Sequence, residues 1–207
     1  MIAAAAVLLG YLVGSLPTGL VVIRLLKGID IRAHGSGNIG ATNVFRVAGL
    51  PTAALVLLLD MAKGAVPVLL AEAWAPSPLM AVLAGLAAIA GHNWSLFLRF
   101  TGGKGIATSF GVLLALSPAA AAVAALVWVG VVAVTRYASL GSLLGIAAVP
   151  AAMWRRGEPR EHLGFAALAL LFAVYKHRTN IGRLLAGTEL RITDRPDQAT
   201  GHPTRRA

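Results

Sequence analysis

Long apolar runs separated by short polar connections make up most of this chain. Six such runs lie at residues 2–23, 50–74, 79–97, 106–134, 140–154 and 163–175. An α-helix needs about 20 apolar residues to cross the hydrocarbon core of a bilayer. Because a helix satisfies its backbone polar groups within its own segment, the pattern predicts an all-α integral membrane protein.

The fourth run is too long for a single span. It exceeds the roughly 20 residues that one span needs, and it contains Ser117 and Pro118 near its middle. Proline has no backbone N–H and interrupts a helix, so we predict two helices that meet at this point. The chain is then a polytopic bundle of about seven transmembrane helices.

The charges of the connections predict the orientation of this bundle. The connection at 75–78 is uncharged, whereas those at 24–46 and 99–104 are basic. Basic residues gather on the cytoplasmic side of membrane proteins. We therefore place the N-terminus outside and, with seven spans, the basic C-terminus in the cytoplasm. The connection at 155–161 then lies outside, where two glutamates partly balance its three arginines.

The composition agrees with this class, since 57% of the residues are hydrophobic and 13% are charged. We predict one membrane-embedded domain over residues 1–192 and a disordered cytoplasmic tail over the polar residues 193–207. The net charge of +10 lies in short connections and not on one soluble face, so no nucleic-acid partner is expected. The absence of cysteine excludes disulfides and thiolate chemistry.

Three glycine-rich polar stretches interrupt the apolar pattern, at residues 35–43, 101–108 and 176–183. Small residues let a ligand approach backbone N–H groups, and the accompanying lysine and arginine supply positive charge. The seven-span arrangement puts all three stretches on the cytoplasmic side. We therefore predict that they converge on one site for a phosphorylated substrate.

The second stretch has the features of an anion site. Gly102, Gly103, Lys104 and Gly105 immediately precede a predicted helix, whose first N–H groups are unpaired and whose dipole favours an anion. The segment is not a Walker A loop, because Leu98 stands where the first glycine should be and glycine follows the lysine. The structural alternative is a flexible turn whose lysine reaches the bilayer surface.

The first stretch could surround a polyol phosphate with donors and acceptors. It supplies Ser36, Asn38, Thr42 and Asn43, and Arg46 follows one helical turn later. Arginine suits a bidentate phosphate contact, and a serine hydroxyl can attack a substrate if a base lies nearby. The alternative is a capped loop between two helices.

The third stretch offers His177 and Asn180, which share one side of a helix at their i, i+3 spacing. A histidine, with a reference pKa of about 6.5, is a candidate proton acceptor near neutral pH. The alternative is a polar residue at the membrane boundary. No group of histidines and carboxylates has metal-ligand spacing, so neither a metal nor a cofactor is expected.

Other polar residues lie within or beside the apolar runs. The i, i+3 spacing of Asp60 and Lys63 allows an ion pair inside the second span. Ser142, after Arg136 at a predicted helix entrance, could cap that helix or contact phosphate. We interpret residues 92–94, which end with a tryptophan, as an anchor at the membrane interface.

Together these motifs resemble the bacterial acyl-phosphate:glycerol-3-phosphate acyltransferases, the PlsY family. The resemblance rests on residues 36–43 with Arg46, on 102–108, and on 177–183 followed by Gly187 and Glu189; segments 59–64 and 135–142 extend it over nearly the whole chain. It implies an inner-membrane enzyme with a cytoplasmic active site. Its substrates would be glycerol 3-phosphate and long-chain acyl phosphate, and its products lysophosphatidic acid and phosphate. Apart from membrane lipid, no cofactor or obligatory protein partner is implied.

The same resemblance implies individual roles. The glycine-rich loop with Lys104 would bind the phosphate of glycerol 3-phosphate, helped by Arg46. Ser36 and Asn38 would belong to the polar lining of the site, and His177 and Asn180 would be required for activity. Ser142 would contact acyl phosphate, and Glu189 would have a structural role.

Two mechanisms and one competing function remain open at this stage. The substrate hydroxyl can attack the donor directly, with either His177 or a donor phosphate oxygen accepting the proton; an acyl-enzyme on Ser36 is the less favoured route. A solute transporter would also suit seven apolar spans. It should, however, bind its substrate near mid-membrane and show internal repeats, whereas the three stretches map to one face.

Overall fold

The computed structural model of the protein describes residues 2–194. Within these residues the chain is all-α, as predicted, and contains no strand. Its helices are α1 (Ile2–Ser15), α2 (Thr18–Lys27), α3 (Ala41–Trp74), α4 (Pro78–Asn93), α5 (Ile106–Leu116), α6 (Pro118–Thr135), α7 (Ala138–Arg155), α8 (Arg160–Lys176) and α9 (Arg178–Leu185). Two short 3-10 turns are Ile31–Ala33 and Leu96–Leu98. Most of the predicted tail, from residue 195 onward, lies outside the described residues.

Several helices can cross a membrane. Four described segments, Ala4–Lys27, Ala41–Trp74, Pro118–Thr135 and Ala138–Arg155, are long and apolar enough, and α4 and α5 are shorter apolar helices. The predicted division of the fourth run is confirmed, because α5 ends at Leu116 and α6 begins at Pro118. The Ser117 hydroxyl accepts a hydrogen bond from the Ala120 amide at 3.3 Å and so caps α6.

Two other segments are less regular than the apolar pattern indicated. The first run is not one helix: α1 ends at Ser15 and α2 begins at Thr18, after Pro17. In the second run the helix starts before the predicted boundary, at Ala41, and is kinked at Gly49, whose φ of 79° and ψ of 178° are not helical. A short first part of α3, which carries Arg46, therefore projects from the long apolar part.

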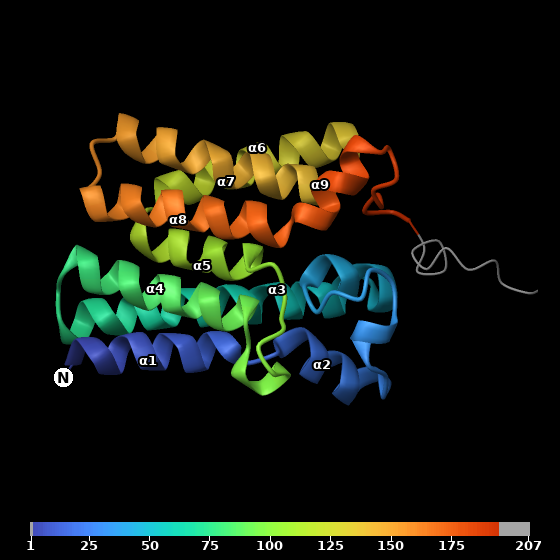
Figure 1. Ribbon diagram of the computed structural model, residues 1–207, viewed down its shortest axis with the longest axis horizontal. Helices are drawn as coiled ribbons and strands as arrows, with labels where there is room; N and C mark the ends of the chain where they lie inside the picture. The colour runs from blue at the N-terminus through green and yellow to red at the C-terminus, as the bar shows by residue number, and fades with distance from the viewer. Residues whose placement is uncertain (1, 195–207) are drawn as a thin grey trace, which may run out of the picture.

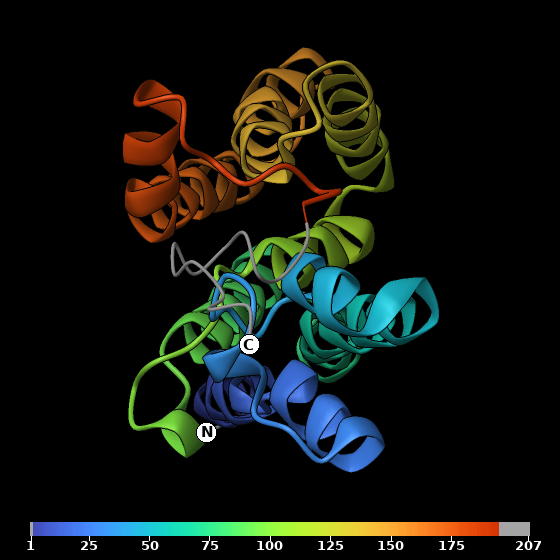
Figure 2. The same ribbon diagram turned by 90° about the vertical axis from the view of Figure 1, so that its right-hand side faces the viewer.

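The long helices lie side by side along the long axis of the molecule (Figure 1). α1 packs against α3 and α4, and α3 packs against α5, while α6, α7 and α8 pack in series. Viewed from the end, these two groups form two halves (Figure 2). They are joined where α8 contacts α4 and where α5 continues into α6. Small residues permit the closest approaches: a Cβ at Gly64 of α3 would overlap the Thr108 carbonyl oxygen of α5.

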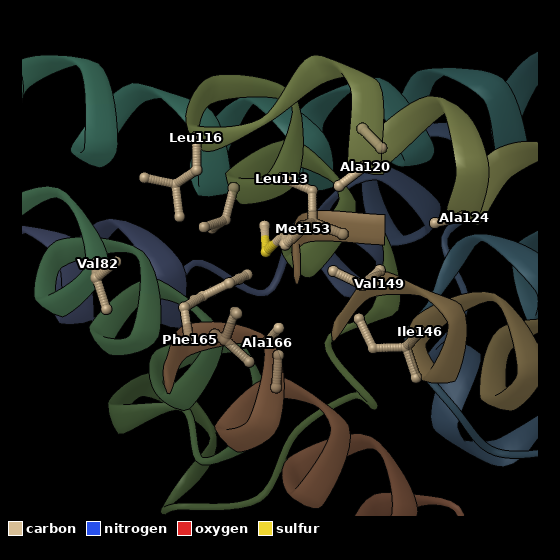
Figure 3. Packing of buried hydrophobic residues seen from close by; sticks show 14 of the residues in the cluster. Val82, Leu113, Leu116, Ala120, Ala124, Ile146, Val149, Met153, Phe165 and Ala166 are labelled. Atoms are coloured by element: carbon tan, nitrogen blue, oxygen red, sulfur yellow. The ribbon is translucent and has the colours of Figure 1, made fainter. Parts of the chain in front are cut away.

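The apolar core between the halves is built by α4, α5, α6, α7 and α8. Figure 3 shows Leu113 and Leu116 beside Val149, Met153 and Phe165. Phe165 and Met153 are completely buried. This core holds α5 against α7 and α8, and α5 begins and α8 ends beside the three polar stretches.

The polar segments gather at one end of the bundle. α2, the connection after it, the turn between α6 and α7, and α9 all lie toward the right of Figure 1. After α9 the chain runs across this end between the two halves, as Figure 2 shows. This arrangement brings the first and third polar stretches to the same end of the molecule.

Candidate functional site

A cavity of about 300 Å³ lies where the three stretches meet. It contains all but two of the residues that the sequence analysis predicted to bind substrate. Its predicted lining residues are Ser36, Asn38, Thr42, Asn43, Arg46, Lys104, Gly105, Ser142, His177 and Asn180, together with Asp60 and Glu189. One cavity is therefore lined by residues from α3, from the glycine-rich connection, from α7, from α9 and from the segment after α9.

The two predicted residues outside the cavity lining are Gly102 and Gly103. The Gly103 N–H donates a hydrogen bond to the His92 carbonyl at 3.1 Å, so it does not face a ligand. A Cβ on Gly102 would overlap the same carbonyl oxygen. These glycines allow the connection to lie against the end of α4. Gly105, the residue before α5, has a φ of 76°, a conformation that favours glycine.

Lys104 is the cation most closely enclosed by the site. Its Nζ donates a hydrogen bond to Asn180 Oδ1 at 2.5 Å. Burial lowers the pKa of Lys104 to about 8, with Arg183 and Arg46 acting in the same direction and Glu189 opposing them. An anion bound in the cavity would favour the charged ammonium and raise this pKa again.

His177 presents a neutral imidazole to the cavity. Its Nδ1 lies 2.8 Å from the Ala173 carbonyl oxygen, which can only accept a hydrogen bond. Nδ1 therefore carries the proton, and Nε2 is left as an acceptor. Burial, followed by the charge of Lys104, lowers the pKa of His177 to about 4. The side chain is consequently uncharged at neutral pH but is a weak base.

Glu189 holds several site residues together. Its Oε1 accepts hydrogen bonds from Asn180 Nδ2 at 2.5 Å and from the Ser139 hydroxyl at 2.7 Å. Its Oε2 accepts one from Arg183 Nε at 2.7 Å. Burial alone would raise the pKa of Glu189, but these hydrogen bonds and the charge of Arg183 lower it. The carboxylate thereby fixes the Asn180 amide so that its oxygen faces Lys104.

Arg46 joins α3 to the segment at 189–192. Its Nη2 donates to the carbonyls of Leu190 and Arg191, at 3.4 and 3.1 Å, and its Nε to that of Arg191 at 3.3 Å. On the other side, the Ile192 N–H donates to the Arg136 carbonyl at 2.8 Å. The segment therefore bridges α3 and the turn between α6 and α7.

The first stretch is held in shape by Asn43. Its Oδ1 accepts from the Ser36 N–H at 2.8 Å, and its Nδ2 donates to the carbonyls of His34 and Asn38 at 3.0 and 2.9 Å. These contacts use the polar atoms of a side chain that we expected to bind substrate. The exposed Ser36 hydroxyl makes no hydrogen bond to any residue between 2 and 194, so no base activates it there.

Away from its polar mouth the cavity continues as an apolar limb. The Ser142 hydroxyl, at the start of this limb, donates to the Ala138 carbonyl at 2.8 Å. The apolar lining comes from four helices: Leu57 and Met61 of α3, Phe110 and Leu113 of α5, Ala125, Trp128 and Val129 of α6, and Ile146 of α7. Leu57 and Val129 are also exposed on the outer surface. The limb therefore reaches the lateral face of the bundle, and the site suits a ligand with an anionic head and an apolar chain.

The buried polar residues of α3 and α4 form a network behind the site. Asp60 Oδ1 lies 2.8 Å from Lys63 Nζ, at the predicted i, i+3 spacing. Lys63 also donates to the Leu16 carbonyl at 2.8 Å, and the Thr18 hydroxyl donates to Asp60, so the pair ties α3 to the break between α1 and α2. Sequence reasoning assigned Asp60 to this pair but not to the cavity wall.

The prediction of a membrane anchor at residues 92–94 is wrong for His92 and Asn93. His92 and Asn93 are only 3% and 1% exposed, because α1, α8 and the glycine-rich connection enclose the end of α4. Trp94 is half-buried against Phe172 and Tyr175. Sequence reasoning likewise gave no site role to Arg183, although its place in the third stretch was a usable signal.

Residues 2–194 contain no group of three or more histidine or acidic side chains suited to a metal ion. The positive charge of the site comes from lysine and arginine side chains.

Residues 4–187 match the profile of a protein family described as glycerol-3-phosphate acyltransferase. The glycerol-3-phosphate acyltransferase of Desulforudis audaxviator is 54% identical over 187 residues, which cover 90% of this chain and 94% of that protein. The glycerol-3-phosphate acyltransferase of Desulforamulus reducens is 50% identical over 182 residues, or 88% and 91% of the two chains.

The fold is also that of a solved membrane protein. The crystal structure of PlsY (YgiH), an integral membrane glycerol 3-phosphate acyltransferase, in its glycerol 3-phosphate form has a TM-score of 0.87 to this structure and 40% sequence identity. The match covers 91% of this chain and 94% of that one. The lysophosphatidic acid form gives a TM-score of 0.86 over the same shares.

Proposed function

The chain belongs to the glycerol-3-phosphate acyltransferase family, the PlsY family, and on this premise we propose that it moves a long-chain acyl group from acyl phosphate to the 1-hydroxyl of glycerol 3-phosphate. The products are lysophosphatidic acid and inorganic phosphate. The observation that carries this proposal is one cavity with a cationic polar mouth and an apolar limb open to the lateral surface. Such a cavity accommodates a water-soluble phosphate and a lipid-soluble chain side by side.

Glycerol 3-phosphate occupies the polar mouth in this proposal. Its phosphate binds Lys104 and the first N–H groups of α5, where the helix dipole also favours an anion. Arg46 contributes a second charge-assisted contact. Ser36, Asn38 and Thr42, which line the same mouth, contact the hydroxyl groups of the substrate.

Acyl phosphate places its chain in the apolar limb and its phosphate near Ser142. Burial of a hydrocarbon chain against α3, α5, α6 and α7 stabilises the complex by about 25 cal/mol per Å² of apolar surface. The exposure of Leu57 and Val129 gives the donor a lateral route from the bilayer. The reactive carbonyl then lies at the junction between limb and mouth.

The acyl transfer is a single displacement in this mechanism. The oxygen of the substrate 1-hydroxyl forms a bond to the donor carbonyl carbon, the bond from that carbon to the phosphate oxygen breaks, and phosphate leaves with the electron pair. With a pKa of about 4, His177 is a poor proton acceptor. We therefore assign the proton of the 1-hydroxyl to a phosphate oxygen of the donor, and we assign His177 Nε2 to accepting a hydrogen bond from the 2-hydroxyl, which orients the glycerol backbone.

An acyl-enzyme on Ser36 is the less favoured route. The side chain is exposed, and its hydroxyl lacks a hydrogen-bonded base among residues 2–194. A nucleophilic serine needs such a base, because its hydroxyl is weakly reactive at neutral pH. Direct attack requires only alignment of the two substrates and neutralisation of their phosphates.

The proposed setting is a bacterial inner membrane, with about seven spans, the N-terminus outside and the site facing the cytoplasm. The elements at the end of the bundle that carries the site hold basic residues: Arg24 and Lys27 lie in α2, Arg136 in the turn between α6 and α7, and Arg178 in α9. Such an excess favours the cytoplasmic side. The proposal includes no cofactor and no obligatory protein partner.

The identity of the donor tests this function directly. Purified protein in lipid vesicles is given labelled glycerol 3-phosphate with either palmitoyl phosphate or palmitoyl-CoA, and lysophosphatidic acid is measured. We expect product from palmitoyl phosphate only, because the site has a place for a small phosphate leaving group at the limb. Product from palmitoyl-CoA alone would contradict the donor assignment, and no product from folded protein with either donor would contradict the function.

The pH dependence of substrate binding tests the role of Lys104. A lysine is charged below its pKa, so the ammonium is present below about pH 8 and is lost above it. We expect the KM for glycerol 3-phosphate to be constant between pH 7 and 7.5 and then to rise, by roughly tenfold per pH unit well above the pKa.

Lys104→Arg is the matched control, because arginine stays charged in this range. Its KM should show no such rise above pH 8. An identical rise in both proteins would assign the pH dependence to another group.

A further inference from the structure

The last turn of α4 lies outside the three glycine-rich stretches but contacts two of them. The His92 carbonyl accepts the Gly103 N–H at 3.1 Å, and the Asn93 carbonyl accepts Lys176 Nζ at 2.7 Å. Gly103 is followed by Lys104, and Lys176 is followed by His177. The end of α4 is therefore hydrogen-bonded to the residue before Lys104 and to the residue before His177.

On one side, the His92 ring holds the glycine-rich connection. It is almost fully buried, and a Cβ on Gly103 would overlap its Nε2. Its Nδ1 lies 3.6 Å from Asp60 Oδ1 and has no hydrogen-bond partner within residues 2–194. The connection before Lys104 thus rests on the end of α4, which Asp60 contacts from α3.

On the other side, Lys176 holds the end of α8. Its ammonium lies 5.4 Å from the centre of the Trp94 ring as well as on the Asn93 carbonyl. The Trp94 ring makes an edge contact with Phe172, one turn earlier in α8, at 5.4 Å between ring centres. A helix end has carbonyls without intrahelical partners, and Lys176 satisfies one of them.

These contacts matter because the site is assembled from both halves of the bundle. The hydrogen bond from Lys104 to Asn180 crosses from the glycine-rich connection to α9. We propose that Lys176 is a positioning residue. It fixes the position of α8 and α9 relative to the end of α4 and so sets the distance from Lys104 to Asn180 and His177. The expected effect of a Lys176 substitution on kcat rests on the function proposed above. Lys176 does not line the cavity.

Lys176→Met tests this proposal, with Arg178→Met as the matched control. Arg178 is an exposed cation two residues later. Among residues 2–194 its guanidinium contacts Tyr175 at the end of α8, donating to the Tyr175 carbonyl at 3.1 Å, and makes no hydrogen bond to α4. A misplacement of about 1 Å can lower a rate by up to about 100-fold. We expect Lys176→Met, assayed well below its thermal midpoint, to lower kcat by roughly tenfold with a smaller change in KM, and Arg178→Met to resemble the wild type. The thermal midpoint of Lys176→Met should fall, because the Asn93 carbonyl loses its donor.

Lys176→Arg separates positioning from simple structural support. Arginine can also donate to the Asn93 carbonyl and stack on Trp94, so it should recover most of kcat. A wild-type kcat in Lys176→Met would overturn the proposal. Equal losses in the variants at 176 and 178 would also overturn it.

A second measurement does not depend on activity. Because the chain has no cysteine, Phe97→Cys and Thr179→Cys can carry a pair of spin labels, one on the 3-10 turn Leu96–Leu98 before the glycine-rich stretch and one on α9. We expect Lys176→Met to shift or broaden the distance between these labels and Arg178→Met to leave it unchanged. An unchanged distance between the labels in Lys176→Met would refute the positioning role of Lys176, whatever the acyl-transfer activity. A shifted distance in Lys176→Met, together with a wild-type protein that has no acyl-transfer activity, would refute only the proposed function.

Discussion

Replacement of Lys104 by methionine is expected to lower kcat/KM for glycerol 3-phosphate by roughly 100-fold to 1,000-fold. Methionine has a similar length but supplies neither the ammonium nor a hydrogen-bond donor. Lys104 is enclosed by the cavity wall, where an electrostatic contact with phosphate is stronger than in water. The variant also leaves Asn180 Oδ1 without the donor that it has at 2.5 Å. The loss is measured by steady-state kinetics at saturating palmitoyl phosphate.

Arg99→Met is the control for this loss. Arg99 belongs to the same connection between α4 and α5, but it is exposed and lies outside the cavity lining. Its replacement removes the same formal charge and should change kcat/KM less than threefold, or about 0.6 kcal/mol. If both variants lose activity equally, general attraction of the substrate by the basic surface explains the effect, and Lys104 is not a specific phosphate contact.

Glu189→Gln is expected to lower kcat by roughly 100-fold, since losing hydrogen bonds to a buried charged group costs about 1–3 kcal/mol each. The carboxylate accepts from Asn180, Ser139 and Arg183, and glutamine would turn an N–H₂ group toward one of these donors. Asn180 would then lose its orientation toward Lys104. The same change leaves Arg183 without its ion pair, so the thermal midpoint should fall as well.

Glu161→Gln provides the comparison for Glu189→Gln. Glu161 is exposed in the first turn of α8, at the end of that helix remote from the site. Its replacement also removes one carboxylate and should leave kcat and the thermal midpoint unchanged. A Glu189→Gln enzyme with normal kcat would show that Asn180 needs no partner to reach its working orientation.

The sequence predicted local breaks well where two signals agreed. The division at Ser117 and Pro118 followed from both the excess length of the run and the effect of proline on a helix. Pro17 has the same effect, but the first run has the length of a single span, so length gave no reason to divide it there. The kink at Gly49 lies directly before the run at 50–74, so the apolar pattern located the long part of α3 but not the short part before the kink.

The site could be predicted as a set of residues but not as a geometry. The number of spans and the basic charge of the connections predicted that Arg46, Lys104 and His177 lie on one face of the membrane. All three line the cavity. The direction of a side chain is set by its neighbours in space. Asn43 is an example. From its place in the first stretch it was expected to bind substrate, but in the structure its amide makes hydrogen bonds that hold the loop. The apolar limb was invisible in sequence because four helices must pack before it exists.

The end of α4 shows the same limitation from another direction. Position at the end of an apolar run, next to tryptophan, is typical of a membrane-interface residue. His92 and Asn93 have that position, but tertiary packing encloses them. Their connection to the site appears only in the structure, where their carbonyls contact Gly103 and Lys176 and the His92 ring lines the cavity.

The contact between Arg46 and the segment at 189–192 has a consequence for how this family can vary. Arg46 binds the carbonyls of residues 190 and 191, and the Arg136 carbonyl likewise takes a main-chain N–H, that of Ile192. Every residue type supplies a carbonyl, so substitutions at 191 leave this bridge intact. Selection can therefore retain the arginine while its partner position drifts freely, and pairwise covariation between aligned sequences would not detect the contact.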